Sequence, residues 1–230
     1  MSIRPQAIVA LDVASLDDAR AVVTRLGDRA GFYKVGLQLF SAAGPRVVEW
    51  LHAEGKRVFL DLKLHDIPRT VCRAAETAQR MGVALLTVHG LGGSSMVRAA
   101  VEAAGEKTGV LVVTVLTSLD LATASDALGR QLSSVEDEVL RLAALALDAR
   151  AHGVVCAGAE CAAVRTRCGS AIRTLVPGIR GPGAPPDDQA RVVTAAAAAR
   201  AGAAYVVVGR AVTAAPDPVG AYERVLADLV

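Results

Sequence analysis

The chain has 230 residues, of which 53% are hydrophobic, 3% aromatic and 21% charged. We expect one globular domain over residues 1–230, because this length buries one sizeable core and the composition fits neither disorder nor a coiled coil. The 25 Lys and Arg residues against 23 Asp and Glu residues give a formal net charge of +2. So mild a balance argues against nucleic acid and against a membrane surface as partners.

The most apolar stretch, residues 192–208, is too weak for a membrane span. It contains Arg200 and Gly202 and nearly half of it is alanine, whereas a span needs about 20 strongly apolar residues. The apolar run at the N-terminus is short and ends at Asp12, which is not the pattern of a signal peptide. We therefore expect a cytoplasmic protein.

The four cysteines give no sign of a metal site or of a disulfide. Cys72, Cys156, Cys161 and Cys168 form no Cys-x-x-Cys pair, and no histidine stands near them at zinc-ligand spacing. Disulfides are also rare in cytoplasmic proteins. We expect buried, reduced thiols and no bound metal.

Short apolar runs alternate with segments of helical periodicity along the whole chain. The runs that predict strands are residues 7–11, 32–35, 57–62, 85–89, 110–116, 154–156, 174–176 and 205–208. The segments that predict helices are residues 15–26, 42–52, 69–81, 94–104, 135–152, 159–167, 189–201 and 218–229, with an additional short helix over 121–128. Eight such units with nearly continuous apolar strands predict a parallel sheet closed into a (β/α)8 TIM barrel. An open doubly wound sheet is the alternative.

One connection stands out by its composition. Residues 178–188, GIRGPGAPPDD, are rich in Gly and Pro and follow the seventh predicted strand. Long connections in compact domains are often lids over a binding site. We expect a lid here, with a plain surface connection as the alternative.

Polar residues gather where the predicted strands end. In a barrel of this class the reacting groups sit at the C-terminal ends of the strands. The polar residues and the glycine that fall there are Asp12, Lys34, Asp61, Lys63, His89, Thr117, Arg180, Gly209 and Arg210. Asp61 and Lys63 are two residues apart and so share one face of their strand. Inside a barrel these charges must be paired.

Lys63 stands between two carboxylates in the sequence, Asp61 and Asp66. Opposite charges favour the protonated ammonium. A Schiff-base lysine requires a neutral amine, so we expect Lys63 to deliver a proton to a developing carbanion while the carboxylates hold it in place. A buried ion-pair network that only braces the barrel is the alternative.

The residues after the seventh and eighth strands predict a phosphate site. Gly209 and Arg210 follow the eighth strand and Arg180 follows the seventh, where barrels of this class often bind phosphate. A phosphorylated substrate is therefore expected. His89 has two possible roles, as a general acid or base or as a structural residue of the barrel mouth. We assign no chemistry to His65.

Residues 58–71, VFLDLKLHDIPRTV, closely resemble the signature of the orotidine 5′-phosphate decarboxylase family, Asp-x-Lys-x-x-Asp-Ile-Pro-x-Thr. Further blocks resemble that family in the same order, namely IVALDVAS around Asp12, FYKVGLQLF around Lys34, TVHGLGG, VLTSL around Thr117, VPGIR and VVGRAV. The resemblance covers nearly the whole chain. Arg69 stands where relatives often carry Asn, at a position that the signature leaves variable.

The resemblance implies a cofactor-free decarboxylation of orotidine 5′-monophosphate to UMP and carbon dioxide, the last step of UMP synthesis, by a homodimer with shared sites. Lys63 would donate the proton to C6, and Asp61 would lie against the substrate carboxylate. Asp66 would reach the site of the other subunit. Lys34, beside Asp12, would complete the chain of charges and touch the ribose.

The resemblance also implies further contacts with the substrate. Thr117 and Gln189 would meet the pyrimidine and the phosphate side, and the glycine- and proline-rich stretch would close over the phosphate. The full set of substrate-binding residues implied is Asp12, Lys34, Asp61, Ile67, Thr70, Thr117, Arg180, Gln189, Gly209 and Arg210.

Two other functions remain open at this stage. A magnesium-dependent sugar-phosphate lyase or synthase would use a similar barrel and motif, but such enzymes place a Glu on the second strand, where this chain has Lys34, and an ammonium repels a divalent ion. A non-catalytic barrel that binds a phosphorylated ligand is expected to lack part of the charged chain, which here is present throughout.

Overall fold

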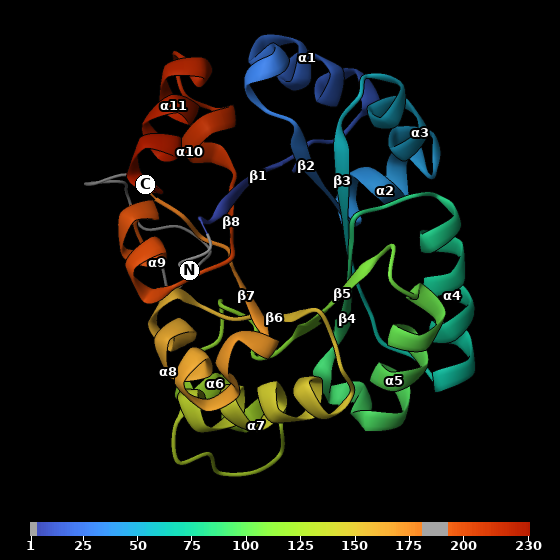
Figure 1. Ribbon diagram of the computed structural model, residues 1–230, viewed down its shortest axis with the longest axis vertical. Helices are drawn as coiled ribbons and strands as arrows, with labels where there is room; N and C mark the ends of the chain where they lie inside the picture. The colour runs from blue at the N-terminus through green and yellow to red at the C-terminus, as the bar shows by residue number, and fades with distance from the viewer. Residues whose placement is uncertain (1–3, 181–192) are drawn as a thin grey trace.

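The computed structural model describes residues 4–180 and 193–230, and its centre is a closed barrel of parallel strands (Figure 1). The strands follow one another round the barrel in chain order, and β1 pairs with β8 to close it. The strands are β1 Gln6–Ala10, β2 Phe32–Gly36, β3 Arg57–Leu64, β4 Leu85–His89, β5 Gly109–Val113, β6 Gly153–Val155, β7 Arg173–Val176 and β8 Tyr205–Val208. The predicted (β/α)8 barrel is thus confirmed.

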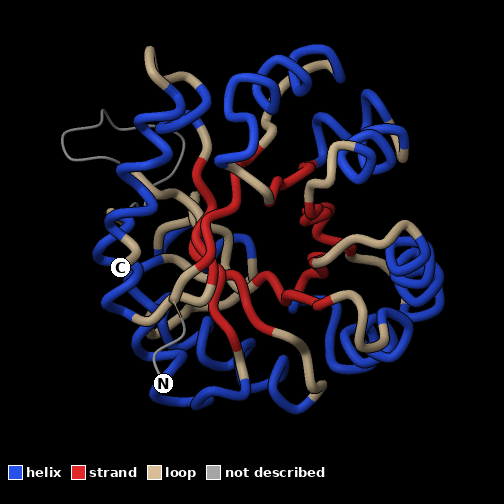
Figure 2. Tube along the Cα trace, turned by 45° about the horizontal axis from the view of Figure 1, so that its top comes forward, coloured by secondary structure: helices blue, strands red, loops and turns tan. Residues whose placement is uncertain are grey.

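Helices cover the outside of the barrel on all sides (Figure 2). They are α1 Leu16–Leu26, α2 Leu37–Ala43, α3 Arg46–Ala53, α4 Pro68–Arg80, α5 Gly93–Ala104, α6 Leu121–Ala127, α7 Val135–Asp148, α8 Gly158–Cys168, α9 Ala195–Ala201, α10 Arg210–Thr213 and α11 Pro218–Asp228. Three short 3-10 turns, at Gly27–Arg29, Gly90–Gly92 and Gly169–Ala171, join helices to strands. No helix in the described ranges is both long and apolar enough to cross a membrane.

The strands bury both of their faces, which explains their apolar composition. In β1, Ile8 and Ala10 point into the barrel and pack with Phe59 and Leu111, whereas Val9 packs in the layer between barrel and helices. Parallel strands that are covered on both sides need apolar residues at almost every position. The buried hydrophobic residues therefore form two layers, one inside the barrel and one between the barrel and the helices.

Three predicted boundaries are wrong for identifiable reasons. The helix expected over 42–52 begins at Arg46 as α3, because Gly44 takes a positive φ of 61° and Pro45 stands at the N-cap, and most of the preceding helix α2, Leu37–Ala43, was not predicted. The helix expected over 135–152 ends at Asp148, and Arg150 then turns the chain with a φ of 57°. The strand expected over 110–116 ends at Val113, where its registered pairing with His89 and Val155 ends.

The helix expected over 189–201 lies partly outside the described residues. Within them, α9 begins at Ala195, and the side chain of Thr194 caps it by accepting the N–H of Ala197. Val193 is not helical but forms a parallel bridge with Ile179. The short helix α10 was not predicted, because four residues are too few to show a helical period.

A polar cluster at the N-terminal end of the barrel should make the stability of the fold depend on pH. His152 precedes β6, and its Nε2 lies 2.9 Å from the hydroxyl of Tyr205 while Arg173 Nη1 lies 3.2 Å from its Nδ1. Burial, with a further contribution from the charge of Arg173, lowers the pKa of His152 to about 4. The unfolded chain therefore binds a proton between pH 6.5 and 4 that the folded chain does not bind.

The free energy of unfolding is accordingly expected to fall as the pH is lowered from 6.5 toward 4, and His152→Gln should remove this part of the loss. Urea unfolding at pH 7.5 and pH 5.0 measures it. The difference in stability between wild type and variant should change by about 1 kcal/mol between the two conditions, after allowance for the partial exposure of the ring. An equal difference at both pH values would contradict the assignment.

Candidate active site

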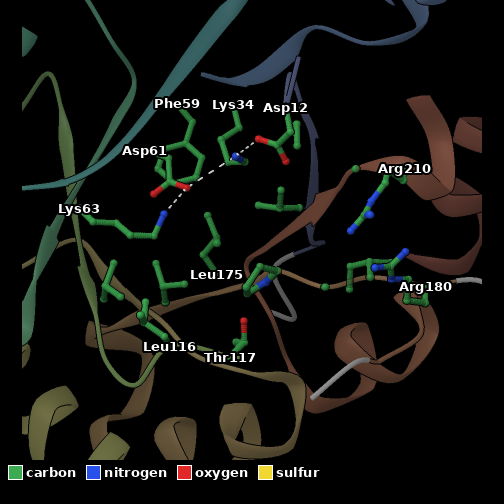
Figure 3. Close-up of a pocket in the computed structure, with 18 of the residues that line it drawn as sticks. Asp12, Lys34, Phe59, Asp61, Lys63, Leu116, Thr117, Leu175, Arg180 and Arg210 are labelled. Atoms are coloured by element: carbon green, nitrogen blue, oxygen red, sulfur yellow. Dashed lines mark hydrogen bonds and ion pairs between the residues drawn. The ribbon is translucent and has the colours of Figure 1, made fainter. Parts of the chain in front are cut away.

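The C-terminal ends of the strands surround a cavity of about 470 Å³ (Figure 3). A volume of this size lies within the range of small-molecule sites. Its lining residues are Ala10, Asp12, Lys34, Phe59, Asp61, Lys63, Val113, Val115, Leu116, Thr117, Val155, Leu175, Pro177, Gly178, Ile179, Arg180, Val207, Gly209, Arg210 and Thr213. Seven of the predicted substrate-binding residues are thereby brought together from six different strand ends, and Lys63 joins them.

One side of the cavity carries a continuous chain of charges (Figure 3). Lys34 Nζ lies 2.7 Å from Asp12 Oδ1 and 3.7 Å from Asp61 Oδ2, and Lys63 Nζ lies 2.9 Å from the same Asp61 oxygen. The side chains of Lys34 and Asp61 are each only 12% exposed. The two ammonium groups and two carboxylates balance in charge, as burial requires.

The order of charges differs from the prediction. The sequence places Lys63 between two carboxylates, but within the described part of the chain the ion pair of Lys63 is with Asp61 and not with Asp66. Asp61 is instead the carboxylate between two ammonium groups. The reason is that Asp66 lies on an exposed turn, where its Oδ1 accepts the N–H of Ile67 at 2.6 Å.

Three predicted residues lie away from this cavity, and a fourth lies outside the described residues. Asp66, Ile67 and Thr70 are exposed around the start of α4 and do not line the cavity of their own chain. Gln189 and most of the expected lid, residues 178–188, fall outside the described residues, apart from Gly178, Ile179 and Arg180, which line the cavity.

Asp61 and Lys63 share a face as predicted, but regular alternation is not the cause. From Leu60 to Leu64, β3 takes four steps while β4 takes two, from Leu86 to Val88, so β3 carries a bulge. Lys63 within this bulge has a φ of 49°, in the left-handed region that non-glycine residues seldom adopt. The bulge re-aims the Lys63 side chain toward Asp61.

The other side of the cavity carries two arginines. Arg180 follows β7 and Arg210 opens α10 after β8, and both lie across the cavity from Lys63 (Figure 3). The N–H of Arg180 donates to Val193 O at 3.0 Å, which fixes the backbone at this point. Two guanidinium groups at one end of a cavity suit a doubly charged anion such as a phosphate monoester.

Several lining residues were not singled out from the sequence. Phe59 could have been found, because it lies two residues before Asp61 and so shares its face. Thr213 belongs to α10, the helix that the sequence did not reveal. Pro177 and Ile179 belong to the block VPGIR, but they reach the cavity through the path of the chain after β7, which no local pattern predicts.

His65 and His89 lie near the cavity but pack against each other and do not line it. The rings of His65 and His89 stack with centroids 5.3 Å apart, and His89 Nδ1 accepts the N–H of Leu91 at 3.3 Å. Burial, with smaller contributions from His65 and Lys63, lowers the pKa of His89, so its ring is neutral near pH 7. Neither ring lines the cavity, which favours the structural reading of His89.

The carboxylates of the site are already occupied by cations of the chain itself. The Lys34 ammonium stands between Asp12 and Asp61. Within the described ranges, no group of three or more His, Cys, Asp or Glu side chains is arranged to hold a metal ion.

The comparisons with known proteins agree on one family. The family model described as "Orotidine 5'-phosphate decarboxylase / HUMPS family" matches residues 5–225. A protein named orotidine 5'-phosphate decarboxylase from Anaeromyxobacter dehalogenans is 50% identical, over 96% of each chain. One of the same name from Moorella thermoacetica is 44% identical, over 100% of this chain and 94% of its own.

Two solved structures have the same fold as this chain over nearly its whole length. The crystal structure of orotidine 5'-phosphate decarboxylase from Lactobacillus acidophilus matches with a TM-score of 0.86 and 35% identity, covering 98% of this chain and 99% of the other. The crystal structure of an uncharacterized conserved protein from Geobacillus kaustophilus matches with a TM-score of 0.84 and 33% identity, covering 97% of this chain and 100% of the other.

Removing the central cation of the charged chain should cost stability. Lys34→Met leaves Asp12 without its ion pair and Asp61 with one ammonium instead of two, and we expect a loss of about 2 kcal/mol in the free energy of unfolding. Arg20→Met is the control, because the ion pair that it removes, between Arg20 and Asp17, has both side chains more than half exposed, and its loss should cost well under about 1 kcal/mol. Urea unfolding compares them, and equal losses would contradict the assignment.

Proposed function

The chain belongs to the orotidine 5'-phosphate decarboxylase / HUMPS family, and we propose that it converts orotidine 5′-monophosphate to UMP and carbon dioxide, with Lys63 as the proton donor. The observation that carries this proposal is the Lys63 ammonium, held 2.9 Å from Asp61 in a cavity whose far end carries Arg180 and Arg210. Arg180 and Arg210 lie across the cavity from Lys63 (Figure 3), so a nucleotide with its phosphate at the arginines would extend toward Lys63.

The reaction needs one proton donor and no electron acceptor. The bond between C6 and the carboxylate carbon breaks, carbon dioxide leaves, and the electron pair stays on C6. A proton then moves from Lys63 Nζ to C6, and the neutral amine recovers a proton from water. The side chain of Lys63 is 34% exposed, which leaves it accessible to solvent for this last step.

Two electrostatic contributions act on the substrate, and their sizes differ. Asp61 would lie near the substrate carboxylate, and two like charges about 4 Å apart repel by about 4 kcal/mol at an effective dielectric constant near 20. Enzymatic accelerations can demand upwards of about 20 kcal/mol. The larger share therefore falls to the fixed ammonium of Lys63, which stabilises the negative charge that develops on C6.

Groups distant from C6 supply binding energy. Arg180 and Arg210, with the backbone at Gly209, are placed to hold the phosphate, while Lys34 and Asp12 stand where the ribose would lie. Contacts made far from the reacting carbon can be used to order the site and exclude water. Thr117 lines the cavity after β5 and is assigned to the pyrimidine. The family resemblance alone assigns Gln189, which lies outside the described residues, to the phosphate side.

The reaction is proposed to need neither metal nor cofactor. A divalent ion would require free carboxylates, but Asp12 and Asp61 share the Lys34 ammonium, and Asp61 also binds Lys63. An ammonium at this position repels a second cation. This arrangement favours the decarboxylase over a magnesium-dependent sugar-phosphate lyase or synthase.

We also propose that the enzyme is a homodimer in which Asp66 enters the partner's active site. Asp66 and Thr70 are exposed in the single chain, and the neighbouring Ile67 leaves 65% of its surface exposed. Leu91 adds a second large apolar side chain that is 43% exposed. A second subunit that covers these side chains would remove apolar surface from water. It would also bring Ile67 and Thr70 of this chain close to the substrate bound in the second subunit.

We propose a cytoplasmic location. No disulfide joins the four cysteines in the described part of the chain, and three of them, Cys156, Cys161 and Cys168, are buried. Reduced thiols of this kind are typical of proteins in a reducing compartment.

Purified protein should convert orotidine 5′-monophosphate to UMP at full rate in the presence of a chelator, as followed by the change in ultraviolet absorbance. Lys63→Ala should lower kcat by at least about a thousandfold, because the reaction loses its proton donor and its fixed positive charge. Lys107→Ala, at an exposed position, is the control and should leave turnover unchanged.

Three other results would each contradict a different part of the proposed function. Turnover that survives Lys63→Ala would overturn the proposed mechanism. Loss of activity with chelator and its return with magnesium would favour the metal-dependent reading. Calorimetry that finds tight UMP binding by a wild-type protein without turnover would favour a non-catalytic binding barrel.

The shared site can be tested by mixing two inactive variants. In a dimer of one Lys63→Ala subunit and one Asp66→Asn subunit, one site keeps its own Lys63 and receives Asp66 from the partner. Random exchange of subunits should therefore restore about a quarter of the wild-type activity, because half of the dimers are mixed and each has one intact site. If Asp66 served its own subunit's site, the mixture would stay inactive.

A further inference from the structure

The bulge in β3 places three residues of that strand opposite a single residue of β4. The registered pairs Leu60 with Leu86 and Leu64 with Val88 leave residues 61–63 facing Thr87 alone. A bulge of this size interrupts the ladder of backbone hydrogen bonds, so its polar groups must find other partners. For the backbone N–H of Lys63, that partner is the side chain of Thr87.

The hydroxyl of Thr87 bridges the two functional residues of the bulge. Its Oγ1 accepts the backbone N–H of Lys63 at 2.9 Å and donates to Asp61 Oδ1 at 2.9 Å. Thr87 is fully buried and does not line the cavity. One hydroxyl group thus serves both as acceptor and as donor, each time toward a residue that faces the substrate.

These two hydrogen bonds define the geometry of the charged chain. The bond to Asp61 Oδ1 orients the carboxylate so that its second oxygen, Oδ2, faces the ammonium groups of Lys34 and Lys63. The bond to the Lys63 N–H holds the backbone at a φ of 49°, a conformation that needs external support in a residue with a side chain. Asp61 and Lys63 are therefore held relative to each other through Thr87 as well as through their own ion pair.

We propose that Thr87 is a positioning residue for the decarboxylation, which sets the orientation of Asp61 and the backbone of Lys63 without touching the substrate. The proposal rests on the proposed function and adds to it a residue outside the cavity. The rate of the chemical step then depends on the hydroxyl of Thr87 and not on the volume of its side chain.

Two substitutions separate the hydroxyl from the volume. Thr87→Val has nearly the same shape but leaves the Lys63 N–H without its acceptor and Asp61 Oδ1 without its donor. Thr87→Ser keeps the hydroxyl and removes one methyl group. Thr174→Val is the matched control, because Thr174 is an equally buried barrel threonine whose Oγ1 contacts Cys161 Sγ on the helix side.

Steady-state kinetics with orotidine 5′-monophosphate and calorimetry with UMP test the proposal. Thr87→Val should lower kcat by about tenfold to a hundredfold, since misplacement of reacting groups by less than 1 Å has effects of this order. KM and the Kd of UMP should change by less than about threefold, because the arginines at the phosphate end are untouched. Thr87→Ser should keep kcat within about threefold of wild type, and Thr174→Val should leave it unchanged.

The outcomes are distinguishable. A wild-type protein without turnover contradicts the proposed function itself. A wild-type protein that turns over, with Thr87→Val equally active, overturns the role of Thr87 alone. Equal loss of kcat in Thr87→Val and Thr87→Ser also overturns it, because packing and not the hydroxyl would then be responsible.

Poor folding of Thr87→Val would not block the test. Circular dichroism identifies that case, and Thr87→Ala then replaces the valine variant, since it also lacks the hydroxyl but introduces no branched apolar group beside Asp61. Folded Thr87→Ala with the kinetics of Thr87→Ser would overturn the proposal. A further loss of kcat relative to Thr87→Ser, with unchanged UMP binding, would support it.

Discussion

A buried carboxylate between two ammonium groups is the constraint that organises this molecule. Asp61 is only 8% exposed, and an isolated charge in that position would be very unfavourable. Its Oδ2 binds Lys34 from β2 and Lys63 from the bulge of β3, and its Oδ1 accepts the hydroxyl of Thr87 from β4. Three neighbouring strands must therefore keep their register for the charges to remain compensated.

The barrel makes this arrangement possible because the residues that stabilise the fold and the charged residues of the cavity lie in different parts of it. Its interior and the layer beneath the helices are apolar, whereas the charged groups lie where the strands end. The cavity is itself divided, with the paired charges on one side and Arg180 and Arg210 on the other (Figure 3). A nucleotide monophosphate has the same division between a reacting ring and a phosphate, which is why the geometry suits this substrate class.

The regular part of the fold was predictable because its signals are local. Apolar runs at strand length and amphipathic periods at helix length gave all eight units and the closed barrel. Errors arose where a single residue changes the path of the chain, as at Gly44 with its positive φ and at Arg150. The Gly-Pro pair at 44–45 was a readable signal for a break, whereas a left-handed arginine has none.

For the site, the order of residues was sufficient to identify the family signature, the cluster of Asp12, Lys34, Asp61 and Lys63, and the two arginines that follow β7 and β8. It did not reveal that Asp61 is the centre of the charge network, that Asp66 lies apart from Lys63, or that Thr87 joins Asp61 to Lys63. Those facts depend on the bulge between β3 and β4. A period of two describes one strand alone, but a bulge is a property of two paired strands, so it is defined only once β3 and β4 have paired.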